Sequence, residues 1–126
     1  MAFAFEKLSV YQKAIEFGTT VIGAVERLSA PRNHFRLIEQ LEAAATSVAM
    51  NIAEGKGRYS KKEFRHFLYI ARGSLYETIA LLQILLRLQW IDFKSYQKIY
   101  ADAEEISKML SGLISSIAKD KTPNPS

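Results

Sequence analysis

Cysteine is absent from this 126-residue sequence, and residues that break helices are few, with six glycines and three prolines. Without cysteine there is no disulfide framework, no thiolate nucleophile and no cysteine-based zinc site. The sequence also lacks a basic N-terminal segment followed by an apolar stretch, and its densest apolar run, residues 79–88, is interrupted by Gln83 and Arg87. We therefore expect a helical, globular protein of the cytoplasm without a secretory signal or a membrane partner.

Acidic residues are fewer than basic ones, and the formal net charge is +4. Much of the positive charge lies in the short stretch between Glu54 and His66. The cations of this stretch are Lys56, Arg58, Lys61, Lys62 and Arg65, whereas acidic residues gather at Asp102, Glu104 and Glu105. A local excess of cations attracts phosphates, so the basic stretch is a candidate for contact with nucleic acid.

Apolar residues recur at spacings of three and four in four segments, which is typical of helices with one buried stripe. The expected helices cover residues 9–28, 34–54, 61–89 and 93–118. Their lengths and short connections predict an all-α protein, an up-down-up-down antiparallel four-helix bundle spanning residues 9–118. Residues 1–8 form an apolar N-terminal arm, expected to pack on the bundle or on a neighbouring subunit, and residues 119–126 a flexible tail.

Polar residues and glycines stand where the expected helices begin and end. Ser60 and Glu63 fit a capping box, in which the Ser60 hydroxyl accepts from the Glu63 amide while the Glu63 carboxylate accepts from the Ser60 amide. Gly55 and Gly57 follow the second helix, where either could take the left-handed C-cap conformation. Candidate N-caps of the first and fourth helices are Ser9 and Asp92.

The expected helix 61–89 carries more apolar surface than one bundle core requires. Beside its main apolar stripe runs a second stripe, formed by Phe67, Ile70, Ser74, Leu81, Ile84 and Leu88. A stripe of this width left in water is unfavourable, and wide apolar patches mark interaction surfaces. We therefore expect this helix to face another copy of the chain.

A third side of the same helix carries cations and tyrosines spaced three, four or seven residues apart. Its members are Lys62, Arg65, Tyr69, Arg72, Tyr76, Gln83 and Arg87. Cations neutralise phosphates and aromatic rings stack on unpaired bases, so this pattern is consistent with nucleic-acid binding. Tyrosine and arginine are also enriched in protein interfaces, which leaves a subunit or partner contact and a solvated face as alternatives.

The connection 55–62 could hold a phosphate with its amides and cations, near the positive end of the helix that follows. It lacks the order GxxxxGK[ST] of a nucleotide P-loop, and a basic turn with glycines at positive φ is the alternative.

The polar residues beside the apolar stripes are Asn51, Glu54 and Glu77. With Arg58 and Arg72 as partners, they predict a structural polar network rather than acid–base catalysis. Glu63 and His66 have the Glu-x-x-His spacing of di-iron bundles, but one such pair does not make that site, so we expect no metal.

Three runs of residues are similar to those of a known family. They are FEKLSVYQKA at 5–14, NIAEGKGR at 51–58 and EFRHFLYIARGSLYE at 63–77. Through them the sequence resembles the four-helix-bundle proteins encoded in intervening sequences of bacterial 23S rRNA genes, over about residues 5–117. That family includes the accessory variability proteins of diversity-generating retroelements, which form pentameric rings and bind nucleic acid and a reverse transcriptase. The resemblance implies a homopentamer with a basic surface, although Glu42 and Ala43 stand where the family usually has basic residues.

Patterns and resemblance together predict a bacterial, non-enzymatic homo-oligomer without cofactors that binds RNA or DNA. The residues expected to contact nucleic acid are Lys56, Arg58, Lys61, Lys62, Arg65, Tyr69, Arg72, Tyr76 and Arg87. The alternative is a protein–protein interaction scaffold that binds no nucleic acid, in which subunit or partner contacts occupy the same Arg/Tyr stripe.

Overall fold

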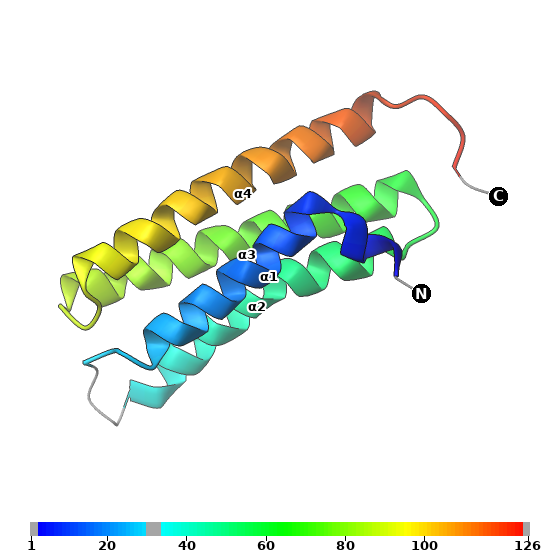
Figure 1. Ribbon diagram of the computed structural model, residues 1–126. Coiled ribbons are helices and arrows are strands. Elements are labelled where there is room, and N and C mark those ends of the chain that lie inside the picture. Colours follow the sequence, from blue (N-terminus) through cyan, green and yellow to red (C-terminus); the bar gives the residue numbers. More distant parts are fainter. Residues whose placement is uncertain (1–2, 30–33, 125–126) are drawn as a thin grey trace.

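The computed structural model describes residues 3–29 and 34–124, most of which form four helices. A 3₁₀ turn, η1 (Ala4–Lys7), precedes the helices α1 (Ser9–Val25), α2 (Phe35–Lys56), α3 (Lys61–Arg87) and α4 (Phe93–Lys119). Each helix packs against the next, and α4 packs against α1, which closes the bundle. Figure 1 shows the α2–α3 connection at the end that carries η1 and the last turn of α4, with the other two connections at the opposite end. The predicted all-α, up-down-up-down antiparallel four-helix bundle is confirmed.

The predicted apolar stripes supply most of the bundle core, and Leu85 and Ile114 are core residues outside those stripes. The largest fully buried side chains of the core include Phe17, Leu41, Ile52, Leu68, Leu75, Leu82, Ile99, Ile106 and Leu110. Each side chain of this size stabilises the fold by about 1.5–3 kcal/mol when it is removed from water. Every buried side-chain nitrogen or oxygen in the described residues has a hydrogen-bond partner, including the hydroxyl of Thr78, which donates to the Ser74 carbonyl at 2.8 Å.

Two of the three predicted helix starts have the expected caps. The Asp92 carboxylate accepts from the Ser95 amide at 2.9 Å, and the Ser60 hydroxyl accepts from the Glu63 amide at 3.1 Å. The return contact of the capping box differs from the prediction, because Glu63 accepts from the Ser60 hydroxyl at 3.0 Å. Ser9 was the wrong choice of cap: the half-buried Leu8 already holds the extended cap conformation and packs on the core, so Ser9 becomes the first helical residue.

The first helix ends at Val25, three residues before the predicted Leu28. The chain tightens there into a turn, in which the Leu28 amide donates to the Val25 carbonyl at 3.2 Å and the half-buried Leu28 still packs on the core. The Ser29 amide then donates to the Trp90 carbonyl at 3.0 Å, which ties the α1–α2 connection to the α3–α4 connection. Pro31, expected just beyond this helix, lies outside the described residues.

The second helix extends to Lys56, and the predicted left-handed glycine cap is wrong. Gly57 has a right-handed φ of −79°, and none of the described glycines has a positive φ. Gly55 instead occupies the last turn of α2 as a buried residue, where it faces α3. A Cβ at position 55 would lie 2.6 Å from the Cβ of Phe67, so the absence of a side chain lets the two helices approach closely at this point.

The left-handed position that the glycines do not supply is found at the end of α3. Gln89 has a φ of +63°, the only positive φ among non-glycine residues of the described chain. The Gln89 amide donates to the Leu86 carbonyl at 3.0 Å and the Trp90 amide to the Leu85 carbonyl at 2.9 Å, which is the Schellman arrangement of hydrogen bonds. A position usually filled by glycine is thus filled by glutamine.

Because glycine adopts this conformation without steric penalty, Gln89→Gly is expected to raise the free energy of unfolding by about 0.5–1 kcal/mol. Urea denaturation followed by circular dichroism measures the change. The matched control is Gln97→Gly, at an exposed position in the second turn of α4, where the same substitution should lower stability by about 0.5–1 kcal/mol. Equal losses at the two positions would contradict the proposed strain at Gln89.

The N-terminal arm and the C-terminal tail both contact the bundle. In the arm, Leu8 packs on the core and the half-buried Phe5 ring lies edge-on to Tyr11, with centroids 4.9 Å apart. In the tail, the Lys61 ammonium pairs with the Asp120 carboxylate at 3.0 Å, and the Lys61 amide donates to the Asn124 side chain at 3.1 Å. The described part of the tail thus contacts the start of α3 and satisfies a first-turn amide of that helix.

Among the helices of residues 3–29 and 34–124, none combines the length and the hydropathy that crossing a bilayer requires.

Candidate functional site

The Arg/Tyr side of α3 lies along α4, and three hydrogen bonds fix it there. Arg72 donates to the Ser111 hydroxyl at 2.9 Å, and the Gln83 side chain donates to the Tyr96 hydroxyl at 3.1 Å. Between them, the hydroxyls of Tyr76 and Ser107 are 3.3 Å apart. Since these partners follow one another in antiparallel order, the predicted third side of α3 and one edge of α4 form a continuous surface, called the α3/α4 face below.

Cations and tyrosine rings alternate along this face. The Arg72 guanidinium lies over the Tyr69 ring at 5.0 Å from its centroid, so the two side chains orient each other. Near the start of α3, Lys62 and Arg65 line a shallow depression with Ile117 and Ala118 of α4. Arg87, one turn beyond Gln83, continues the row toward the other end. All of these side chains reach solvent in part or in full.

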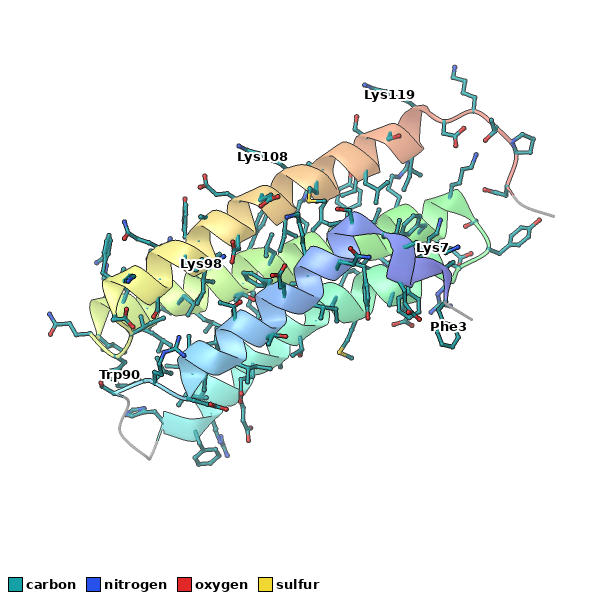
Figure 2. All side chains as sticks on the ribbon, viewed as in Figure 1. Phe3, Lys7, Trp90, Lys98, Lys108 and Lys119 are labelled. Atoms are coloured by element: carbon teal, nitrogen blue, oxygen red, sulfur yellow. The ribbon has the colours of Figure 1, made fainter. Side chains whose placement is uncertain are left out.

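A groove of about 250 Å³ opens in the middle of the face, between α3 and α4. Its floor and walls are Leu75, Tyr76, Ile79, Tyr100, Ala103, Glu104, Ser107 and Lys108. The exposed surface of this groove is mostly apolar, and Lys108 projects outward from α4 at its rim (Figure 2). Glu104 is the one carboxylate among these lining residues.

Of the eight groove residues, only Tyr76 was predicted as a site residue, and Tyr100, Glu104 and Lys108 of α4 were not. They are spaced four apart in the expected helix 93–118, which places them on one side of it, and this spacing was a signal available in the sequence. It did not identify the side that faces α3, because that depends on how the two helices pack. The structure thus adds an α4 edge to the surface that was predicted from α3.

The remaining predicted nucleic-acid residues lie away from the α3/α4 face or are already engaged. Arg58 forms an ion pair with Glu54 at 2.7 Å, and its guanidinium lies over the Phe67 ring, on the α2 side of α3. Lys56 lies over the Phe64 ring at 5.4 Å from its centroid. Lys61 is held by the tail, where hydrogen bonds from Thr122, together with Lys61 itself, lower the pKa of Asp120 to about 2. Lys56 and Arg58 therefore lie apart from the α3/α4 face, whereas Lys61 borders the depression that Lys62 and Arg65 line.

The predicted polar network of Asn51, Glu54 and Glu77 is divided among separate places. Asn51 donates to the Ser47 hydroxyl at 2.8 Å, and Ser47 in turn shares a hydrogen bond of 2.9 Å with Ser74 of α3. Glu54 pairs locally with Arg58, and Glu77 is exposed. They do not meet because Asn51 faces the α2–α3 contact, whereas both glutamates point to solvent.

The acidic residues of α4 are mostly neutralised on its opposite edge. Glu105 pairs with Lys13 of α1 at 2.8 Å, and Asp102 pairs with Lys98 at 2.9 Å. The hydrogen bond with Glu105 raises the pKa of Lys13, and that with Asp102 raises the pKa of Lys98. Both pairs lie beside α1, so the positive charge of the α3/α4 face is opposed locally by Glu104 alone among the groove residues.

Glu63 and His66, which have the Glu-x-x-His spacing of di-iron bundles, contact residues that are not metal ligands. Glu63 belongs to the cap of α3, and the His66 ring lies against Phe67, with centroids 5.8 Å apart. Within residues 3–29 and 34–124, histidines and acidic residues form no group of three that could bind a metal ion.

A second surface, on the α2 side of α3, carries exposed apolar side chains, with the exposed Glu77 midway between Ile70 and Ile84 along the helix. Ile70, Ile84 and Leu88 of α3 are 38%, 49% and 48% exposed, and Met50 of α2 is 66% exposed. Ile70 and Leu88 are about five turns apart and therefore point in the same direction. Met50 and Ile70 each lie one turn from the Ser47–Ser74 contact that joins the two helices. These four residues define the α2/α3 face, which differs from the α3/α4 face.

Known proteins place the fold and the sequence in one family. Residues 6–112 match the family of 23S rRNA-intervening sequence proteins. The crystal structure of a protein of unknown function from Bacteroides thetaiotaomicron, assigned to the S23 ribosomal protein family, is similar over 83% of this chain and 97% of its own, with 30% identity and a TM-score of 0.77. No curated protein matches the chain. The chain therefore belongs to the 23S rRNA-intervening sequence protein family.

Proposed function

We propose that this protein is a non-enzymatic homo-oligomer that binds RNA or DNA through its α3/α4 face. The supporting observation is the composition of that face, where cations and tyrosine rings lie together on one side of the bundle. Its cations are Lys62, Arg65, Arg72, Arg87 and Lys108, and its rings are Tyr69, Tyr76 and Tyr100. Cations neutralise phosphates while rings stack on bases, and both interactions act together in single-strand binding.

The α2/α3 face supports assembly with further copies of the chain, as a pentamer by resemblance. Ile70, Ile84 and Leu88 are the members of the predicted second stripe that stay exposed, whereas Leu81 of that stripe is buried in the core. Because this stripe and the α3/α4 face lie on different sides of α3, subunit contacts through the one leave the other accessible. Repetition of a basic face around an oligomer strengthens binding through multivalency. The proposed setting is the bacterial cytoplasm, without a cofactor.

Removing two cations of the face tests the nucleic-acid proposal. The double substitution Arg65→Ala with Arg72→Ala is expected to weaken binding of a fluorescent single-stranded oligonucleotide and to reduce the log–log salt slope by about 1.4, or about 0.7 for each lost phosphate contact. Fluorescence anisotropy at several KCl concentrations measures both quantities. Light scattering on the same samples should show an unchanged assembly.

The double substitution Lys7→Ala with Arg27→Ala is the charge-matched control. Both side chains are exposed, and they lie away from this face, Lys7 in η1 and Arg27 just after α1. The control should leave the salt slope of the wild type unchanged. Dissociation of the oligomer by Arg65→Ala and Arg72→Ala would assign the stripe to a subunit interface instead. The scaffold alternative predicts no saturable binding of nucleic acid by the wild-type protein.

A further inference from the structure

The groove between α3 and α4 has the size and lining of a site for one planar ring. Its volume of about 250 Å³ lies below the ~300–1,000 Å³ of pockets that enclose a drug-sized ligand. Tyr76 and Tyr100 are 54% and 40% exposed, so both side chains reach solvent beside an apolar floor that includes Ile79 and Ala103. An unstacked base combines a flat apolar surface with polar edges, and this lining matches both.

Charge around the groove favours a ligand attached to phosphates. Arg72 lies one turn before Tyr76 along α3, and Lys108 stands at the rim on α4. An aliphatic peptide side chain carries no charge or aromatic ring with which these cations could pair. A base in the groove would instead place its flanking phosphates near them, where each neutralised phosphate adds to binding.

Glu104 adds a preference among bases. An ionised carboxylate is an acceptor without a donor, and carboxylates recognise the exocyclic amino group of cytosine. Thymine and uracil present a carbonyl oxygen at that position, which the carboxylate repels. A carboxylate is also unfavourable on a surface that binds phosphates, so a role in reading the base accounts for its place in the lining.

We infer that the α3/α4 groove holds one unpaired base of a single-stranded nucleic acid against the Tyr76 and Tyr100 rings, with Glu104 favouring a base that carries an amino group. This inference rests on the proposed function, and it specifies the ligand as single-stranded. Duplex nucleic acid keeps its bases stacked and paired, so it would contact the cations of the face without entering the groove.

The test compares binding of oligo-dC, oligo-dT and a duplex of equal length, at pH 7.5 and constant salt, by fluorescence anisotropy. Tyr100→Ala is expected to weaken binding of both single strands about fivefold or more and to leave duplex binding unchanged. Glu104→Ala is expected to abolish a preference of about threefold or more for oligo-dC over oligo-dT, even as the lost negative charge strengthens binding overall. Oligo-rC and oligo-rU, measured in parallel, distinguish RNA from DNA as the preferred strand.

Phe35→Ala is the matched control, because Phe35 is an exposed aromatic residue of α2, the helix diagonal to α4. It should change neither affinity nor base preference. Photocrosslinking of wild-type protein to an oligonucleotide with one 5-iodocytosine, with the attached peptide mapped by mass spectrometry, does not depend on the folding of any variant. Attachment at Tyr76 or Tyr100 supports the inference, and attachment elsewhere overturns it.

The remaining outcomes separate the inference from the proposed function. Saturable binding that Tyr100→Ala does not weaken, or a base preference that persists in Glu104→Ala, overturns the groove site and leaves the basic face in place. Absence of saturable binding to every strand and duplex overturns both.

Discussion

Ile84→Asp is expected to convert the proposed oligomer into folded monomers. Ile84 is 49% exposed in the last turn of α3, on the α2/α3 face, so an aspartate there costs a single bundle no more than about 1 kcal/mol but is buried without a partner between two subunits. We expect a loss of about 3 kcal/mol for each subunit contact, or roughly a hundredfold in its dissociation constant. Multi-angle light scattering at micromolar concentration measures the mass, and circular dichroism the helix content.

Ile15→Asp provides a matched control for this substitution. Ile15 is an isoleucine of α1 with 47% exposure, nearly that of Ile84, but it lies on a different helix. The control should retain the mass of the wild-type assembly. If Ile84→Asp kept that mass, or if Ile15→Asp dissociated it, the α2/α3 face would not be the subunit contact.

Gly55→Ala is expected to lower the free energy of unfolding by about 1–3 kcal/mol. The added Cβ would lie 2.6 Å from the Cβ of Phe67 and 3.3 Å from the Phe64 carbonyl oxygen. Both atoms belong to or adjoin the backbone of α3, so they cannot move aside without shifting the helix, and overpacking of this kind is destabilising. Urea denaturation measures the change in the midpoint.

Gly57→Ala is the control, at the position that directly follows the last residue of α2. Its Cβ would approach no atom closer than 3.5 Å, and φ at this position is −79°, which alanine adopts freely. We expect it to be neutral or to stabilise the fold by up to about 1 kcal/mol, since alanine restricts the unfolded chain. Equal effects of the two substitutions would contradict a specific close approach of α2 and α3 at Gly55.

The helices were predictable because their periodicity is a local property of the sequence. Apolar residues three and four apart place the buried side of each helix, and the caps at Ser60 and Asp92 depend on residues three positions away. The Arg/Tyr row of α3 followed from the same spacing. Its position beside α4, fixed by Arg72 and Ser111, depends on packing between helices.

Features set by contacts distant in sequence were not predictable. Gly55 looked like a cap, but its role comes from Phe67 on the facing helix. Lys61 looked like a free cation, but it is held by Asp120 at the other end of the chain. Tyr100 enters the groove because α4 packs with that edge toward α3. Periodicity shows which residues share a side of a helix, and tertiary packing decides which neighbour that side meets.

We propose that one helix, α3, carries two independent surfaces: Ile70, Ile84 and Leu88 for assembly, and Arg65, Arg72 and Tyr76 for nucleic acid. Sedimentation velocity of the wild-type protein with a labelled oligo-dC, across a series of KCl concentrations, tests it most directly. Rising salt is expected to release the oligonucleotide while the protein sediments as the same oligomer throughout. A protein that sediments as a monomer at micromolar concentration, or an oligomer that dissociates together with its nucleic acid, would contradict it.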